Sequence, residues 1–142
     1  MADIKFFSED IDFDLPQQPV LGNWIIEIFQ QESGKKLKQV HYVFCSDRFL
    51  VDINRKFLHH DTLTDIITFD LSEKTDNVEA EIYISIPRVR ENSKNMGIPF
   101  QQELHRVMIH GILHLAGYDD QSADEKRIMR IKENECLNLL NI

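Results

Sequence analysis

The amino-acid sequence predicts an α+β fold in which a mixed β-sheet of about four strands packs against helices. Segments rich in β-branched and aromatic residues, typical of strands, lie mostly before Pro87. Apolar residues at helical spacing dominate the part of the chain that follows. Because strands come early and helices late, the α+β class is favoured over a regular alternation of the two. The most apolar of the helices carries two histidines, so we expect a metal site on a buried central helix.

Length and charge indicate one soluble domain. The 142 residues, 42% of them hydrophobic, can fill a single core, so we expect one domain over residues 1–142. Lys and Arg number 16 against 24 Asp and Glu, and the resulting net charge of -8 repels phosphate backbones and anionic membranes. Nucleic-acid binding must therefore rely on a local basic patch, and we expect no DNA partner. The acidic N-terminus and the lack of a long apolar segment predict no membrane association and a cytoplasmic location.

The first half of the chain predicts a strand, a helix, a second strand and a second helix. The first strand begins near Ile4, and the first helix follows a proline-containing break and ends at Gly34. The apolar stripe of this helix consists of Leu21, Trp24, Ile25, Ile28 and Phe29. Residues 40–44 alternate as a second strand, after which Ser46 caps a helix. The expected buried face of that helix consists of Phe49, Leu50, Ile53 and Phe57.

The second half predicts a hairpin followed by three helices. The segments 64–71 and 80–86 have strand composition and are separated by a polar turn. A helix then runs from Pro87 to about Asn95, and a longer one from Phe100 to Gly117. A capping box at Ser122 opens the last helix. Its apolar residues are Ile128, Met129, Ile131, Leu137 and Leu140.

The long apolar helix contains the segment HGILHLAGYDD, which has the pattern of a metal site. His110 and His114 are four residues apart, so their rings project from one helix face close enough to share an ion. Gly117 allows the chain to turn back and to bring Asp119 or Asp120 toward the two imidazoles as a third ligand. Three protein ligands leave a fourth position for water, which is typical of catalytic rather than structural zinc.

The alternative is that the two histidines are core residues hydrogen-bonded to the backbone or to acids. The spacing His-x3-His-x2-Gly-x2-Asp matches zincin proteases, whose metal-binding helix ends at a glycine, and this match favours the metal site. Those proteases carry a general-base Glu directly after the first histidine, where this chain has Gly111. The sequence therefore argues against a peptidase mechanism.

The segment from His110 to Asp120 resembles the hallmark H-G-x-L-H-L-x-G-Y-D-H of the YbeY-type endoribonucleases and fits ten of its eleven positions. An upstream family segment is matched by Asn54, Asp61, Thr64, Asp65 and Phe69. The resemblance implies a zincin-like fold, one zinc ion per chain and single-strand-specific endoribonuclease activity in rRNA processing and ribosome maturation. The implied partners are an rRNA precursor and the small ribosomal subunit or its proteins.

The chain departs from the family pattern at positions that bear on catalysis. Asp120 stands where the family has its third histidine, and by position it becomes the third ligand, with Asp119 as the rival. Its negative charge should leave a bound water less acidic than three histidines would. The family's arginine falls at Leu58, so the expected cation is missing there, and we take Arg55 and His60 as candidates for substrate binding.

Two alternatives to the endoribonuclease hypothesis remain open at this point. The first is a non-catalytic ribosome-assembly factor with a structural zinc, which the leucine at position 58 favours. The second is a metallopeptidase on the same scaffold. The sequence identifies no general base, because metal-activated water either needs none or is assisted by a polar group that the pattern does not specify.

Overall fold

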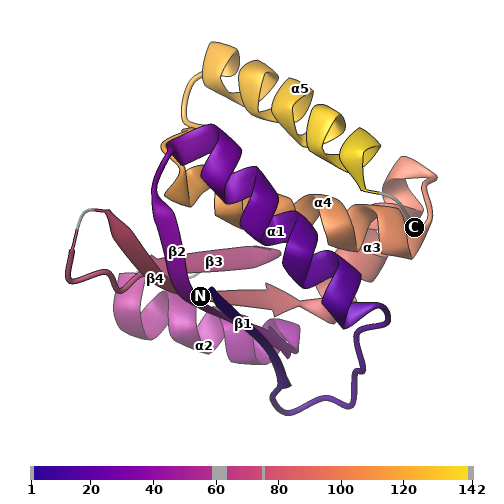
Figure 1. Cartoon of the computed structure of the whole chain (residues 1–142). Helices are drawn as coiled ribbons and strands as arrows, with labels where there is room; N and C mark the ends of the chain where they lie inside the picture. The colour runs from indigo at the N-terminus through magenta and orange to yellow at the C-terminus, as the bar shows by residue number, and fades with distance from the viewer. Residues whose placement is uncertain (1, 59–63, 75, 141–142) are drawn as a thin grey trace.

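Five helices surround a four-stranded sheet in the part of the chain that the structure describes (Figure 1). The structure is a computed structural model and describes residues 2–58, 64–74 and 76–140. The elements in chain order are β1 (Asp3–Ser8), α1 (Gln18–Ser33), β2 (Lys36–Cys45), α2 (Asp47–Leu58), β3 (Ile66–Asp70), β4 (Asn77–Ser85), α3 (Ile86–Met96), α4 (Phe100–Leu115) and α5 (Ala123–Leu139). The predicted α+β class and order of elements are confirmed.

The sheet is mixed, and its strands lie in the order β1-β2-β4-β3. β1 and β4 both pair in parallel with β2, whereas β3 pairs antiparallel with β4, which confirms the predicted hairpin. β3 is therefore an edge strand. Its register places Thr68 opposite Ile82, so that both side chains face α4.

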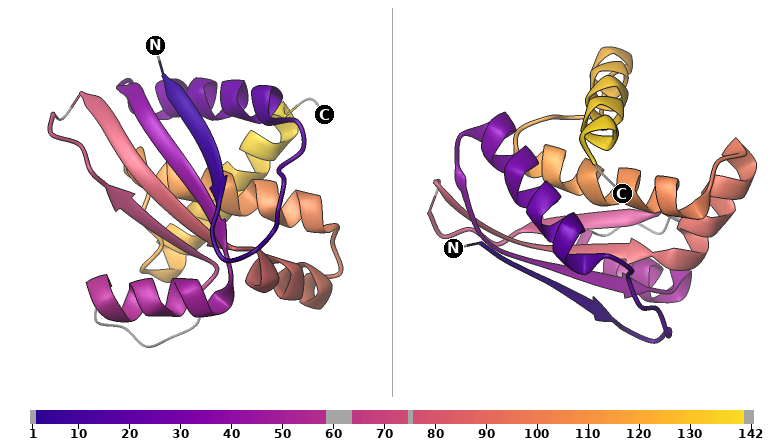
Figure 2. Two further views of the ribbon diagram at one scale, coloured as in Figure 1. Left: turned by 90° about the horizontal axis from the view of Figure 1, so that it is seen from below. Right: turned by 45° about the vertical axis from the view of Figure 1, so that its right-hand side comes forward.

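Helices cover the two faces of the sheet unequally. α1 and α4 lie on one face, α2 lies on the other, and α5 packs on the outer side of α4 (Figure 2). Alternate residues of the two central strands fill the larger core: Val40, Tyr42, Phe44, Val78, Ala80, Ile82 and Ile84. α4 is therefore sandwiched between the sheet and α5, as expected of a helix that is apolar almost all round.

Two predicted apolar faces are only partly buried. On α2, Leu50 is buried, but Phe57 is 62% exposed, because the helix covers only the margin of the sheet at β3 and β4. On α5, Ile128 and Ile131 are 45% and 47% exposed. The residues that α5 buries are Met129, Glu133 and Cys136. Their spacing of four and three defines a narrow stripe, and the neighbouring isoleucines turn away from α4.

Hydrogen bonds between elements fix the central helix. The Tyr42 hydroxyl donates to the carbonyl of Met108 at 2.9 Å, which ties α4 to the sheet two residues before His110. The Trp24 indole donates to the carbonyl of Cys136 at 2.9 Å, which ties α5 to α1. Both bonds are buried, so they are shielded from competition with water.

Cys45 and Cys136 are free and buried. Within the described ranges, no helix has the combined length and hydrophobicity that crossing a membrane requires.

Candidate metal centre

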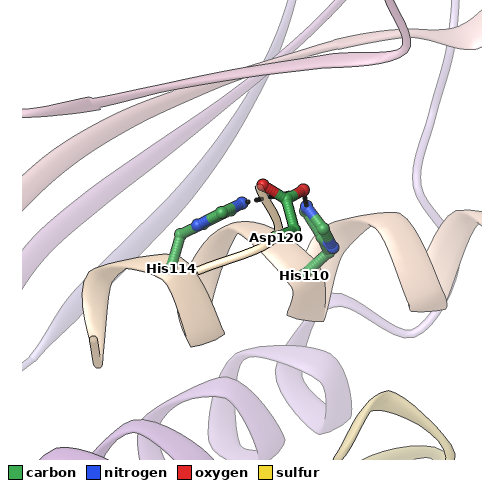
Figure 3. A group of neighbouring side chains, drawn as sticks. All are labelled: His110, His114 and Asp120. Carbon is green, nitrogen blue, oxygen red and sulfur yellow. Dashed lines mark ion pairs between the residues drawn. The ribbon is translucent and has the colours of Figure 1, made fainter. Parts of the chain in front are cut away.

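The last two turns of α4 present both histidines to one carboxylate (Figure 3). The rings of His110 and His114 have centroids 4.6 Å apart. The Nε2 atoms of His110 and His114 lie 3.3 Å and 3.4 Å from Oδ2 of Asp120. The structure therefore brings together the three side chains that the sequence nominated.

The arrangement fits a small divalent cation. Each of the three side chains offers one donor atom, and these atoms lie within 4.8 Å of one another. Zinc bonds to nitrogen and oxygen are about 2.0–2.2 Å long, so tetrahedral ligands are separated by about 3.3–3.5 Å. Both nitrogen-to-oxygen distances match this separation. In the described part of the chain, no other group of three His, Cys, Asp or Glu side chains converges in this way.

The turn after α4 carries Asp120 to the histidines. Gly117 has a φ of +109°, a conformation that residues with a Cβ rarely adopt. The amide of Tyr118 donates to the carbonyl of Leu113 at 3.0 Å, and its hydroxyl donates to Glu32 Oε1 at 2.6 Å. The capping box at Ser122 then starts α5. The chain is thus held on both sides of Asp120, while Asp119 stays outside the cluster.

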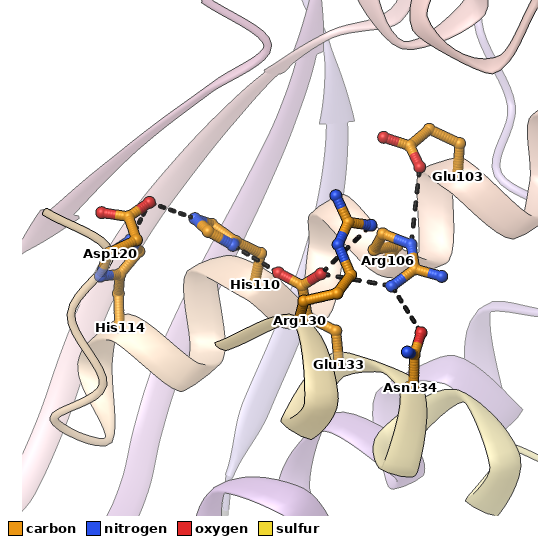
Figure 4. Close-up of polar contacts among 8 residues, drawn as sticks. All are labelled: Glu103, Arg106, His110, His114, Asp120, Arg130, Glu133 and Asn134. Atoms are coloured by element: carbon orange, nitrogen blue, oxygen red, sulfur yellow. Dashed lines mark hydrogen bonds and ion pairs between the residues drawn. The ribbon is translucent and has the colours of Figure 1, made fainter. Parts of the chain in front are cut away.

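A glutamate of α5 forms a contact that sequence reasoning missed. Oε2 of Glu133 lies 2.6 Å from Nδ1 of His110, on the side of the ring away from Asp120 (Figure 4). Burial by itself lowers the pKa of His110, but the hydrogen bond and charge of Glu133, with the charge of Asp120, outweigh burial and raise it. The sequence signal for this contact was helical spacing, which places Glu133 between Met129 and Cys136 on the buried stripe of α5.

A cavity of about 690 Å³ opens in front of the cluster. Its described lining contains no lysine or arginine, and the family arginine position, Leu58, contributes an apolar wall. Arg55 is not among the lining residues and forms an ion pair of 4.0 Å with Asp52. His60 lies outside the described residues.

A second cavity of about 350 Å³ adjoins the first, and the two share Asp65, Ile66, His110 and Asp120. The cations of its lining are Arg106, Lys126 and Arg130. Burial raises the pKa of the Asp65 carboxyl, against the opposing charge of His110. Positive charge close to the candidate ligands therefore comes from α4 and α5 rather than from α2.

Two other residues of α4 are explained by packing. His105 is buried with its ring edge-on to Trp24, and burial lowers its pKa. A Cβ at Gly111 would approach the side chains of Thr68, Ile66 and Ile82 to 3.0–3.1 Å. α4 therefore lies too close to the sheet for a glutamate at the position that zincin proteases use for their general base.

Comparison with known proteins places the chain in a family. The model of the family described as endoribonuclease YbeY matches residues 3–141. The chain belongs to this family. An endoribonuclease YbeY from Amoebophilus asiaticus is 50% identical over 133 residues, covering 94% of this chain and 90% of that protein. One from Flavobacterium psychrophilum is 44% identical over 136 residues, covering 96% of each chain.

The fold agrees with the YbeY assignment. The solution structure of a Thermotoga maritima protein matches with a TM-score of 0.64 and 30% identity, covering 95% of this chain and 87% of that one. YbeY proteins are named as endoribonucleases, enzymes that hydrolyse RNA phosphodiester bonds. The chain is thus a member of an RNA-cleaving enzyme family, and its His110, His114 and Asp120 form a group that could bind a metal ion.

Proposed function

We propose that this chain, as one domain over residues 1–142, is a zinc-dependent endoribonuclease that hydrolyses single-stranded RNA in rRNA processing and ribosome maturation. The open cluster of His110, His114 and Asp120 beside a large cavity is the observation that carries the proposal. Family membership supports RNA as the substrate. We assign one zinc ion per chain, a cytoplasmic location, and an rRNA precursor and the small ribosomal subunit or its proteins as partners.

Three side chains of this chain supply the atoms that would bind a metal ion. Nε2 of His110, Nε2 of His114 and Oδ2 of Asp120 would hold it, and all three residues line the main cavity. When bound, zinc supplies a Lewis acid that activates water and polarises a phosphoryl oxygen. Asp65 lines the same cavity, and burial raises the pKa of its carboxyl above the ordinary value.

Substrate contacts are proposed for two side chains. Arg55 and His60 belong to the segment around the end of α2 and are our candidates for binding the RNA backbone. Because Arg55 is not among the lining residues of the main cavity, its contacts would be made at the rim. Negative phosphates need compensating cations, since the chain as a whole carries a net charge of -8.

One specific observation favours an alternative function. Leu58 places an apolar side chain where the family pattern has its arginine, and this favours a non-catalytic ribosome-assembly factor with a structural zinc. A metallopeptidase is disfavoured by the close packing of Gly111 against β3 and β4, which leaves no room for the general-base glutamate.

The test compares wild type with His114→Ala, each incubated with zinc and labelled single-stranded RNA, duplex RNA or peptide. We expect wild type to cleave only the single-stranded RNA, and His114→Ala to lose cleavage while it keeps its fold and its ribosome binding. Absence of RNA cleavage by the zinc-loaded wild type would overturn the proposal. Joint loss of folding and ribosome binding in His114→Ala would favour the structural-zinc alternative.

A further inference from the structure

Both ring nitrogens of His110 face a carboxylate, but at different distances. Nδ1 lies 2.6 Å from Oε2 of Glu133, whereas Nε2 lies 3.3 Å from Oδ2 of Asp120. A neutral imidazole carries its proton on one nitrogen and a lone pair on the other. The two carboxylates therefore compete for one proton, and the shorter contact, to Glu133, favours the proton on Nδ1.

Glu133 is held so firmly that it acts as a fixed acceptor. Its side chain is 6% exposed, and its Oε1 accepts a hydrogen bond of 3.3 Å from Arg106. Arg130 approaches the same oxygen to 3.7 Å, and Arg106 also donates to Asn134 Oδ1 at 2.8 Å (Figure 4). A buried side chain held by these contacts has little freedom to change its conformation.

No corresponding contact holds the second histidine. His114 forms its ion pair with Asp120 through Nε2, and no carboxylate contacts its Nδ1 within the ranges that the structure describes. Of the two histidines, α5 therefore contacts only His110 among the described contacts.

We propose that Glu133 is a positioning residue that accepts the Nδ1 proton of His110 and so keeps the Nε2 lone pair directed at the metal position. The inference rests on the proposed metal site and adds α5 to it. Carboxylates behind ligating histidines fix the tautomer and ring orientation, and their loss typically weakens metal binding by about 10–100-fold. α5 thereby becomes part of the metal-binding structure, although none of its residues is a candidate ligand.

The first readout is zinc affinity, measured by competition with a chromophoric chelator. We expect Glu133→Ala to weaken zinc binding by about 10–100-fold. In Glu133→Gln the amide oxygen can accept the same hydrogen bond, so we expect partial rescue. Glu135→Ala removes an exposed glutamate of the same helix that pairs with Lys132, and this control should bind zinc like wild type.

The second readout is the tautomer of His110, from ¹⁵N chemical shifts of the metal-free protein at a pH well above the pKa of this histidine. We expect the proton on Nδ1 in wild type and Glu133→Gln. In Glu133→Ala it should move to Nε2, where Asp120 becomes the acceptor. This readout does not depend on metal, so it tests the role of Glu133 even if wild type binds no zinc. Absence of zinc binding by wild type would itself refute the proposed metal site.

The inference is overturned if folded Glu133→Ala binds zinc like wild type, or if it keeps the Nδ1 tautomer. If Glu133→Ala fails to fold, Glu133→Gln decides. A folded Gln variant whose His110 carries its proton on Nε2, although the amide oxygen at position 133 can still accept from Nδ1, would overturn the inference.

Discussion

His110 and His114 lie one turn apart on α4 and approach the same oxygen of Asp120 at nearly equal distances, yet their surroundings differ. The side chain of His110 is 21% exposed and its second nitrogen contacts the buried Glu133. The side chain of His114 is 30% exposed and lines only the larger cavity. One histidine is thus coupled to the packing of α5, whereas the other is positioned by α4 and faces the cavity. Replacing His110 should therefore affect both metal binding and the stability of the fold. Replacing His114 should affect metal binding with little effect on stability.

The largest expected effect comes from replacing each histidine with alanine. Both variants should lose zinc, because two donors form a much weaker site than three. In the absence of metal, the two variants should differ in their free energy of unfolding. His110→Ala removes the partner of the buried Oε2 of Glu133 and should lower the free energy of unfolding by about 1–3 kcal/mol. His114→Ala should change it by less than about 0.5 kcal/mol. Urea unfolding in the presence of a chelator measures both, and equal losses would contradict the comparison.

A smaller effect is expected between the histidines, at Gly111. Gly111→Ala adds a Cβ only 3.0–3.1 Å from Thr68, Ile66 and Ile82, so α4 or these side chains must shift. We expect a net loss of about 1 kcal/mol, because overpacking exceeds the gain in helix propensity. Gly22→Ala on α1 is the matched control. Its Cβ would meet only Ile4, at 3.9 Å, so it should stabilise the fold by about 0.5–1 kcal/mol. Thermal unfolding separates the two, and stabilisation by both variants would be the contrary result.

The cap that follows Asp120 tests the third member of the cluster. Ser122→Ala removes the side-chain acceptor for the Glu125 amide and should destabilise the fold by about 1 kcal/mol. Because Asp120 is also held from the α4 side through Tyr118, zinc stoichiometry should not change. Metal analysis of Ser122→Ala that finds no zinc would mean that the cap itself holds Asp120 in place.

The smallest effect is a pH dependence at His105, the buried histidine of α4 that has no carboxylate in hydrogen-bonding contact among the described residues. Burial lowers its pKa in the folded state, so the unfolded chain binds its proton more readily. Its contribution to stability is therefore present above the unfolded pKa of about 6.5 and is lost as the pH falls through the folded pKa. His105→Phe should flatten this part of the curve of unfolding free energy against pH, and an unchanged slope would refute the assignment.

His110 should show the opposite sign in metal-free protein. Its folded pKa is raised, so its contribution to stability is present below the unfolded pKa and is lost as the pH rises through the folded pKa. The pH profile of unfolding for His110→Ala, set beside that of His105→Phe, therefore distinguishes a histidine paired with a carboxylate from one that is merely buried.

Local sequence signals predicted most of the fold, the histidine pair of the candidate site and the turn that follows it. The i, i+4 spacing of His110 and His114, the turn at Gly117 and the capping box at Ser122 all depend on residues close together in the chain. The same signals could not show which aspartate reaches the histidines, because that depends on how the turn is held by Tyr118 and Glu32.

Sequence patterns did not predict the features that depend on contacts between separate helices and strands. Glu133 is 23 residues from His110, and their contact is set by how α5 lies on α4. Helical periodicity likewise placed Phe57 on the apolar face of α2 but could not indicate that its ring would pack against Phe69 of the edge strand β3 and stay 62% exposed. Periodicity identifies a face, whereas burial depends on the extent of the neighbouring layer.

The most direct test of the metal site is the zinc content per chain of protein purified without an affinity tag. Wild type, Asp120→Ala and Asp119→Ala are measured together. We predict about one zinc ion per chain in wild type and Asp119→Ala, and none in Asp120→Ala. Wild type that holds no metal under conditions that retain zinc would mean that His110 and His114 are core histidines, and the proposed hydrolase mechanism would be rejected with the site.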